Sequence, residues 1–516
     1  MASSITGDFA PARPARPTPP AAAANRGTQL LRWSALAGIG SSLLIIVTIS
    51  AVRNSWAAAP MPWPAPYAPP LLSVSLAPIT VTLGLWGAGL LAAGGVLAGL
   101  AALARGARFP LWLMIGGAVA AVAALTVLPP TGSTDTLDYA AYGRMVVLGH
   151  SPYVMTPDQL RATGDPIGRA APYLWGKRVS LYGPLATVEE AAAALLGGRS
   201  VARIVFWLKL WNALAFGAVA LALDRMVRGD PARRTRVHLL WTVNPLLLWN
   251  LIAGGHLDGL AAAAGFLGLA LFSAPRTDGD PGPLRAAAAG LLIGMAADLK
   301  ISFALFGLGL IWASRRSLRT ALTGAASALV VIVPGYIWFG PPAVAALLSR
   351  SGNDSAVSFY RLLSWLPDSN QLILFLALPG LALVTIAMLV RFPDRAPDLP
   401  AIQPALALSL AWLFIWPYQY PWYDAMVLCM LALYPASRLD WLVIGRLCAA
   451  TIALMPGNSA WPPPAWLSSL ADATLNYVGP GLMLAAAAVL VWLCLTRSWR
   501  IQPPGIARQP ELLRLA

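Results

Sequence analysis

The residues best suited to chemistry follow a pair of prolines, Pro129-Pro130, which should end the helix before them. If residues 135–148 form the next helix, then Asp135, Asp138 and Tyr142 occupy positions i, i+3 and i+7 and share one face. Two carboxylates on one face suit either general-base catalysis or cation binding. The structural alternative is that Asp135 caps the helix and Asp138 stabilises its first turn.

The composition places these residues in a membrane protein. Of the 516 residues, 58% are hydrophobic and only 11% are charged, against roughly 25% in soluble globular proteins. Because so few charges cannot cover a surface in water, lipid must solvate much of the chain. Its three cysteines lie in apolar runs and are expected to be small buried hydrophobes: Cys429, Cys448 and Cys494.

The charged residues predict how the chain crosses the membrane. The net charge is +15, and arginines follow the even-numbered apolar runs. The positive-inside rule therefore places both termini in the cytoplasm. No basic run alternates with aromatic residues, which argues against nucleic-acid binding. We expect about fourteen spans (twelve to fourteen, because two of them could form one broken helix), near residues 30–52, 73–104, 109–128, 201–224, 238–254, 257–274, 285–299, 301–314, 320–339, 371–390, 401–416, 424–437, 441–456 and 474–496.

This arrangement leaves one long segment outside the membrane in the first half of the chain, residues 129–200. It is too long to be a simple connection. Within it, Leu185–Gly197 is apolar but carries Glu189 and Glu190, so it is too short and too charged to span. A helix lying at the membrane interface fits it better. Two smaller segments are also expected outside, residues 340–370 and 457–472.

Four stretches within roughly residues 120–310 resemble one family of membrane enzymes. They are Asp135 with a helix and then Gly149-x-x-Pro152-Tyr153, Tyr182-Gly183-Pro184-Leu185, Asn244–Trp249 followed by Gly254-Gly255-His256-Leu257-Asp258, and Gly294–Lys300. In this order they resemble the polyprenol-phosphate-sugar-dependent glycosyltransferases of the GT-C fold. The nearest likeness is to the polyprenol-phosphate-mannose-dependent α-1,6-mannosyltransferases of actinobacteria. Leu257 departs from the family, which has Asn there, and the C-terminal third matches only loosely, in Trp416–Asp424.

The resemblance implies an all-α, GT-C-like bundle that transfers a sugar, mannose in the nearest relatives, with inversion. The donor would be a polyprenyl-phosphate sugar and the acceptor a glycan or lipoglycan on the outer face of the plasma membrane. No cofactor is expected, although two nearby carboxylates leave a divalent metal open. We expect a disordered cytoplasmic tail at 1–28, one transmembrane catalytic domain at 29–498 and a second cytoplasmic tail at 499–516.

The resemblance also suggests roles for single residues. Asp135 matches the catalytic aspartate and would be the general base, while Asp138 would bind the acceptor. Lys300 stands between apolar stretches, where a lone ammonium is costly without an anion, so it would hold the donor phosphate. Its alternatives are a structural ion pair with Asp298 or snorkelling to water. The other expected donor- or acceptor-binding residues are Tyr142, Arg144, Tyr153, Arg178, Tyr182, His256, Asp258, Trp422 and Tyr423.

Two of those expectations have alternative explanations that involve no binding function. A histidine at the end of a helix, such as His256, is often only a cap partner. Aromatic residues gather at membrane interfaces whatever the function, which could explain Trp422 and Tyr423 without sugar stacking. Two other functions also stay open for the chain as a whole: a polytopic secondary transporter, and a catalytically inactive, lipid-binding envelope protein of the same fold.

Overall fold

In the part of the chain that the structure describes, nearly every element is a helix. The computed structural model describes residues 21–53, 55–59, 61, 71–273, 282–349, 354–391, 399–455, 464–497 and 499. Within these ranges the only β-pairing is two isolated bridges, Val52 with Leu72 and Ala58 with Thr131. The predicted all-α fold is therefore confirmed, while the predicted number of twelve to fourteen spans stays a prediction. Residues 1–20 and 500–516 of the expected tails lie outside the described residues, and α1 already begins at Ala21.

The described helices that are long and apolar enough to cross a membrane number seven. An eighth crossing is added if a pair of helices bent by 117° forms one span, Pro231–Ala253 with Asp258–Phe272. Three shorter apolar helices accompany them, at Leu111–Val127, Ile301–Ala313 and Ile402–Ile415. The seven are α1 (Ala21–Ala51), α2 (Pro78–Ala104), α8 (Val201–Met226), α12 (Gly282–Leu299), α14 (Leu318–Phe339), α16 (Ser369–Arg391), and α20 with η6 and α21 (Ala465–Thr496).

Several remaining helices are short or broken where the sequence has a polar or proline break. The bent pair contains α9 (Pro231–Val237), η1 (His238–Thr242), α10 (Pro245–Leu247), η2 (Leu248–Ala253) and α11 (Asp258–Phe272). As expected, the chain breaks at Lys300, between α12 and η3 (Ile301–Ala304). The other elements of this kind are α3 (Leu111–Val127), α13 (Leu305–Ala313), α17 (Ile402–Ile415), α18 (Ala425–Leu431) and α19 (Arg438–Leu454).

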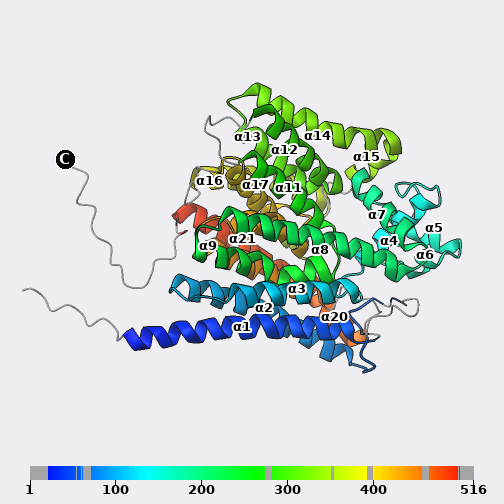
Figure 1. Cartoon of the computed structure of the whole chain (residues 1–516). Coiled ribbons are helices and arrows are strands. Elements are labelled where there is room, and N and C mark those ends of the chain that lie inside the picture. The colour runs from blue at the N-terminus through cyan, green and yellow to red at the C-terminus, as the bar shows by residue number, and fades with distance from the viewer. Residues whose placement is uncertain are drawn as a thin grey trace, which may run out of the picture.

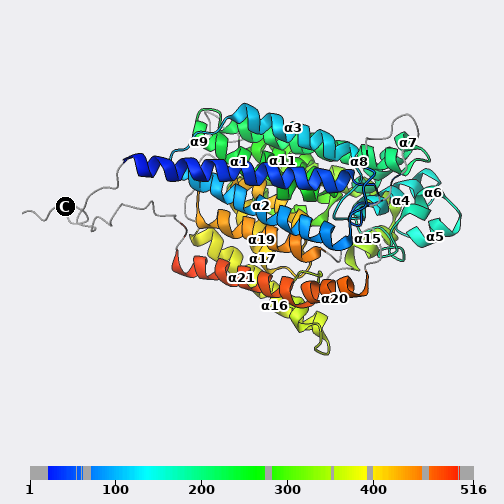
Figure 2. The ribbon, with the colours of Figure 1, turned by 90° about the horizontal axis from the view of Figure 1, so that it is seen from below.

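The long segment 129–200 folds into four short helices at one end of the bundle. Figures 1 and 2 show these helices at the end opposite α9, with α15 and α20 also lying there. They are α4 (Asp135–Val147), α5 (Pro157–Ala162), α6 (Pro166–Ala170) and α7 (Pro184–Gly197). At 14 residues, α7 is too short to span, as predicted for Leu185–Gly197. Three more short elements are α15 (Pro341–Leu348), η4 (Phe359–Leu363) and η5 (Pro421–Asp424).

The core lies between the helices of the two halves of the chain, whereas the outer helices expose apolar faces. Along α14, Leu322, Val330 and Ile337 are 58%, 67% and 75% exposed, as expected of a helix that faces lipid. Inside, the indole of Trp86 in α2 donates to the carbonyls of Ile452 and Met455 at 2.9 Å. Helices about 370 residues apart in sequence are therefore joined in the core.

Two glycines allow α4 to lie in close contact with its neighbours. Gly143 in α4 packs directly on α7, where a Cβ atom would overlap the backbone carbonyl of Glu190. Gly255 has φ +69°, a left-handed conformation that turns the chain between η2 and α11. A Cβ atom there would lie 2.7 Å from the hydroxyl oxygen of Thr136. Both contacts bring α4 close to its neighbours.

Gly143→Ala should therefore destabilise the protein by about 1–3 kcal/mol, because the added methyl group forces α4 away from α7. Thermal unfolding in detergent measures the effect. Gly217→Ala is the matched control, since the methyl group added to this glycine of α8 would meet no atom within 4 Å. An equal loss of stability in both variants would show that α4 and α7 are not in close contact.

Candidate functional site

The candidate residues meet where the start of α4 lies against the bend between η2 and α11. Thr134 occupies the N-cap position, and Asp135 is the first residue of α4, so Asp135 is not the cap. The Asp135 carboxylate lies 3.6 Å from Nδ1 of His256 and accepts a hydrogen bond from the side chain of Trp175. Next to it, the Thr136 hydroxyl donates to the carbonyl of Gly254 at 2.7 Å. This hydrogen bond fixes Asp135 beside the bend.

A buried ion pair occupies the same bend. Nζ of Lys300 lies 2.8 Å and 3.0 Å from the two carboxylate oxygens of Asp258. Asp258 is fully buried and Lys300 is 8% exposed. The expected alternative pairing of Lys300 with Asp298 is wrong, because Asp298 instead accepts from the backbone N–H of Leu185 at 3.1 Å. Asp298 thereby holds the start of α7 against the end of α12.

Burial changes the acid strength of Asp135. It raises the pKa of the Asp135 carboxyl from 3.8 to about 6, because the charged form loses its hydration. The nearby Lys300 ammonium lowers this pKa and the Asp258 carboxylate raises it, so the two neighbours partly cancel. At neutral pH the group is mostly ionised but is a stronger base than an exposed aspartate. Such a pKa suits a general base.

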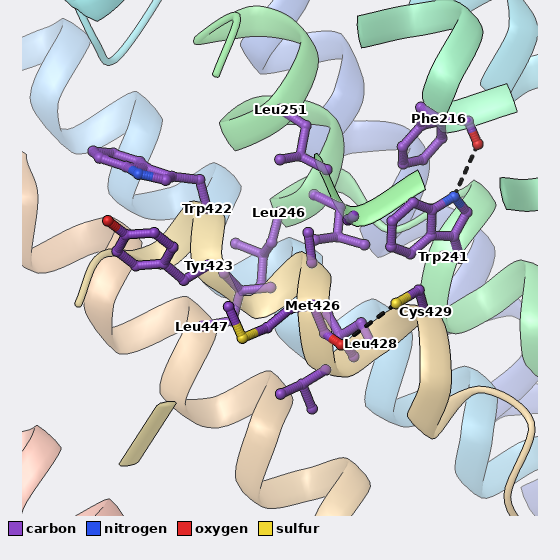
Figure 3. Packing of buried hydrophobic residues seen from close by; sticks show 14 of the residues in the cluster. Phe216, Trp241, Leu246, Leu251, Trp422, Tyr423, Met426, Leu428, Cys429 and Leu447 are labelled. Carbon is purple, nitrogen blue, oxygen red and sulfur yellow. Dashed lines mark hydrogen bonds between the residues drawn. The ribbon is translucent and has the colours of Figure 1, made fainter. Parts of the chain in front are cut away.

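Aromatic rings from the second half of the chain close one side of the cluster. The Trp422 indole stacks on the His256 imidazole, with ring centroids 3.6 Å apart, and Tyr420 stacks on Trp422 at 4.7 Å. Nζ of Lys300 lies 4.0 Å from the ring centroid of Tyr423. Figure 3 shows Trp422 and Tyr423 projecting from one short segment. Since rings pack on both sides of Trp422, it holds His256 in place, and sugar stacking on it stays a prediction.

Two buried carboxyl groups lie on the α4–α7 contact, and only one of them was expected at the site. Asp138 and Glu190 are 3% and 0% exposed, and within the described structure their carboxyl oxygens have no hydrogen-bond partner. Burial is the main reason that the pKa of each lies well above its ordinary value, which favours the neutral acid. Glu190 was not expected from the sequence as a neighbour of the site. The sequence feature that could have identified it is the presence of a glutamate within an apolar helix.

Arg144, Arg178 and Tyr142 take part in contacts within the outer segment. Nε of Arg144 lies 3.0 Å from the carboxylate of Asp165, so this expected donor- or acceptor-binding residue already has an anionic partner. The Tyr142 hydroxyl donates to the backbone carbonyl of Arg178 at 3.1 Å, while the Arg178 side chain is exposed. These contacts support the shape of the segment. Binding of donor or acceptor by these residues stays a prediction.

Two further expected tyrosines connect the outer segment to Lys300. The Tyr153 hydroxyl donates to the carbonyl of Tyr182 at 2.9 Å. The Tyr182 ring lies 5.8 Å from Nζ of Lys300, and its hydroxyl lies 3.2 Å from that of Tyr139. Tyr182 therefore lies against Lys300, and Tyr153 supports it from behind. Tyr139, which precedes the expected Tyr142 on α4, was not singled out from the sequence.

Eight of the expected residues thus lie at or beside one cluster: Asp135, Asp138, Tyr182, His256, Asp258, Lys300, Trp422 and Tyr423. We call Asp135, His256, Asp258 and Lys300 the central cluster. Among the described residues, no group of three or more His, Cys, Asp or Glu side chains is arranged to hold a metal ion. The expectation that no metal cofactor is needed stays a prediction.

The family of the chain follows from comparison with known proteins. Residues 35–316, more than half of the chain, match the family model described as alpha-(1->6)-mannopyranosyltransferase, N-terminal domain. The chain belongs to this family. The match confirms the family suggested by the four sequence motifs, and it contains every member of the central cluster.

Individual relatives agree with this family over a shorter stretch. The chain is 25% identical over 150 residues to alpha-(1->6)-mannopyranosyltransferase B of Corynebacterium glutamicum, covering 29% of this chain and 25% of the relative. It is 28% identical over 136 residues to a probable alpha-(1->6)-mannopyranosyltransferase of Mycolicibacterium smegmatis, covering 26% and 24%. A third relative, from Mycobacterium tuberculosis, is 26% identical over 136 residues. The chain spans about a quarter of the length of these relatives.

Removing one partner of the Lys300–Asp258 pair should be costly. Lys300→Met leaves the Asp258 carboxylate buried and unpaired, so we expect a loss of about 3–5 kcal/mol in unfolding free energy. The double variant Lys300→Met/Asp258→Asn should recover much of this loss, because no uncompensated charge remains. Thermal unfolding of the wild type, both single variants and the double variant gives the interaction free energy between the two side chains. Additive losses would show that the two side chains do not interact.

Proposed function

We propose that the protein is an inverting mannosyltransferase of the membrane. It would transfer mannose from a polyprenyl-phosphate donor to a glycan or lipoglycan acceptor on the outer face. The observation that carries the proposal is the central cluster, which puts a carboxylate of raised pKa beside a buried ammonium. Membership of a mannopyranosyltransferase family supports mannose as the sugar. The identity of the donor lipid and of the acceptor belongs to the proposal alone.

The proposed reaction assigns one chemical task to Asp135. Its carboxylate removes the proton from an acceptor hydroxyl while that oxygen forms a bond to the anomeric carbon of mannose. The bond between this carbon and the phosphate oxygen breaks on the opposite side, and polyprenyl phosphate leaves with the bonding electron pair. The Trp175 side chain, which donates to this carboxylate, would keep Asp135 oriented, and His256 lies beside it at 3.6 Å. Proton transfer by a placed carboxylate contributes typically about 10²–10⁴-fold to a rate.

Lys300 would stabilise the negative charge of the leaving phosphate. An ammonium has three N–H donors, and the two oxygens of Asp258 engage its Nζ at 2.8 Å and 3.0 Å. The third donor could reach a phosphate oxygen, and the Tyr423 ring at 4.0 Å supports the cation. Because Asp258 compensates the charge of Lys300, the ammonium can stay charged before the donor binds.

The orientation in the membrane is also part of the proposal. The segment 129–200 would lie outside and the arginine-rich α9 inside, with both termini in the cytoplasm. Figures 1 and 2 place α4–α6 and α9 at opposite ends of the bundle, which is what this orientation requires. The exposed arginines near α9, among them Arg228 and Arg233, support a cytoplasmic position for that end.

Asp135→Asn should lower the transfer rate by about 10²–10⁴-fold, since the amide cannot accept the proton. The assay follows mannose transfer from a polyprenyl-phosphate mannose to a mannoside acceptor, with thermal unfolding to show that the variant is folded. Asp158→Asn, on α5 of the same outer segment, is the matched control and should stay active. Full activity of Asp135→Asn would rule out this base.

Wild-type protein tested in the same assay separates the other classes of function. Failure to turn over any polyprenyl-phosphate sugar would contradict the proposed transfer. Uptake of a solute by liposomes containing that inactive protein would instead identify a transporter. Binding of the polyprenyl phosphate without either activity would identify a lipid-binding protein that has lost its chemistry.

Labelling of single cysteines tests the orientation. Cys429, Cys448 and Cys494 are all buried, so they should react slowly with a membrane-impermeant maleimide. Tyr173→Cys, at a side chain that is 82% exposed in the outer segment, should be labelled in intact cells. Arg228→Cys, near α9, should be labelled only after the membrane is opened. The reverse pattern would show that the site faces the cytoplasm.

A further inference from the structure

A buried arginine lies in the part of the sequence beyond the residues that the family match covers. Arg446, in the middle of α19, is 2% exposed and donates to the carboxylate of Asp424 and to the side-chain carbonyl of Gln419. Asp424 is fully buried and Gln419 is 1% exposed. All three residues lie beyond residue 316, where the family match ends. One guanidinium therefore joins both ends of the segment Gln419–Asp424.

The same segment is fixed by a second set of contacts at its first residue. The Gln419 amide side chain donates to the carbonyl of Trp416 at 2.9 Å. The Ser355 hydroxyl donates to the backbone carbonyl of Gln419 at 2.6 Å and accepts from its backbone N–H at 3.2 Å. The ends of the segment are thus tied to α19 and to the chain before η4. Between them lie the three rings Tyr420, Trp422 and Tyr423.

These rings are the ones that contact the central cluster. Trp422 stacks on His256 at 3.6 Å, Tyr420 backs Trp422 at 4.7 Å, and Tyr423 lies under Lys300 at 4.0 Å. In Figure 3 Tyr423 lies above Met426 of α18 and Leu447 of α19, and Trp422 lies above Tyr423. A displacement of the segment would therefore shift the Trp422 ring that now lies against His256 and the Tyr423 ring that now lies against Lys300.

We propose that Arg446 is a positioning residue, which uses Asp424 and Gln419 to hold Trp422 against His256 and Tyr423 against Lys300. The second half of the chain would in this way set the geometry of a site whose central cluster lies in the family-matched part. A planar guanidinium is suited to this task, because its fixed fork can bind a carboxylate and an amide oxygen at once. An ammonium is a point donor and cannot span both partners in the same geometry.

That Arg446 matters for sugar transfer rests on the proposed function. Its effect on the stacking of Trp422 against His256 can be measured without turnover. The chain has only three histidines, so protein labelled with ¹³C at histidine gives few ring signals. The His256 signal is identified by its loss in His256→Asn. Stacking on an indole shifts ring protons upfield. Trp422→Leu gives the position of this signal when the stacking is absent.

Arg446→Lys should move the His256 ring signal most of the way to its position in Trp422→Leu. The matched control is Arg236→Lys, which alters another buried arginine that pairs with α19, through Asp440 at 2.6 Å and 2.7 Å. The control should lose stability without moving the His256 signal. In the transfer assay, Arg446→Lys should lower kcat by up to about 100-fold with little change in the donor KM, as expected for a misplaced catalytic group.

Folded Arg446→Lys with an unchanged His256 signal would overturn the proposal, and so would an equal signal change in Arg236→Lys. If Arg446→Lys does not fold, Gln419→Leu replaces it, because this change leaves the Arg446–Asp424 ion pair in place. Gln419→Leu must then move the His256 signal, or the proposal is wrong. If the His256 signal moves in Arg446→Lys but the wild-type protein has no transferase activity, the proposed function is rejected and the positioning role of Arg446 is kept.

Discussion

The arrangement of the site depends on one buried ion pair, Lys300 with Asp258. Both side chains are buried, Asp258 completely and Lys300 to within 8%, and each charge is tolerable only because the other is present. Lys300 follows the last residue of α12 and Asp258 begins α11, so the pair joins two helices at the point where each one breaks. Loss of either partner would leave a single charge in an apolar bundle.

The other parts of the site are arranged around this pair. Gly255 allows the sharp bend that brings Asp258 to Lys300, and Thr136 bonds to the same bend and so fixes α4. Asp298, two residues before Lys300, holds the start of α7. Buried Lys209 in α8 donates to the carbonyl of Leu128 at 2.7 Å, so this carbonyl has a hydrogen-bond partner where the helix ends just before Pro129. Buried polar groups thus hold together helices that lipid surrounds.

The sequence predicted those features that depend on local chemistry. The low charge content indicated a helical membrane protein, and the break at Lys300 and the non-spanning helix at Leu185–Gly197 followed from charges in apolar runs. The four motifs identified the family. Asp135, His256, Asp258 and Lys300 were expected together because the resemblance linked them.

Features that depend on tertiary packing were not predictable in this way. The partner of Lys300 is Asp258, 42 residues away, and not its neighbour Asp298, because the bend at Gly255 decides which carboxylate reaches the ammonium. Arg446 looked like any arginine in an apolar run. Only the fold shows that it meets Asp424 and Gln419, and that the rings between them lie on His256 and Lys300.

The pH dependence of kcat/KM for mannose transfer tests the central claim most directly. Protonation removes the base, so activity should fall about tenfold per pH unit below the pKa of Asp135 and be constant above it. The proposed donor, a polyprenyl-phosphate sugar, is a phosphodiester and would stay ionised throughout this range. The structure predicts that the plateau begins near pH 6, because burial raises the Asp135 pKa to about 6. A plateau that extends down to about pH 4, the ordinary aspartate range, would contradict the assignment of Asp135 as a partly buried base of raised pKa.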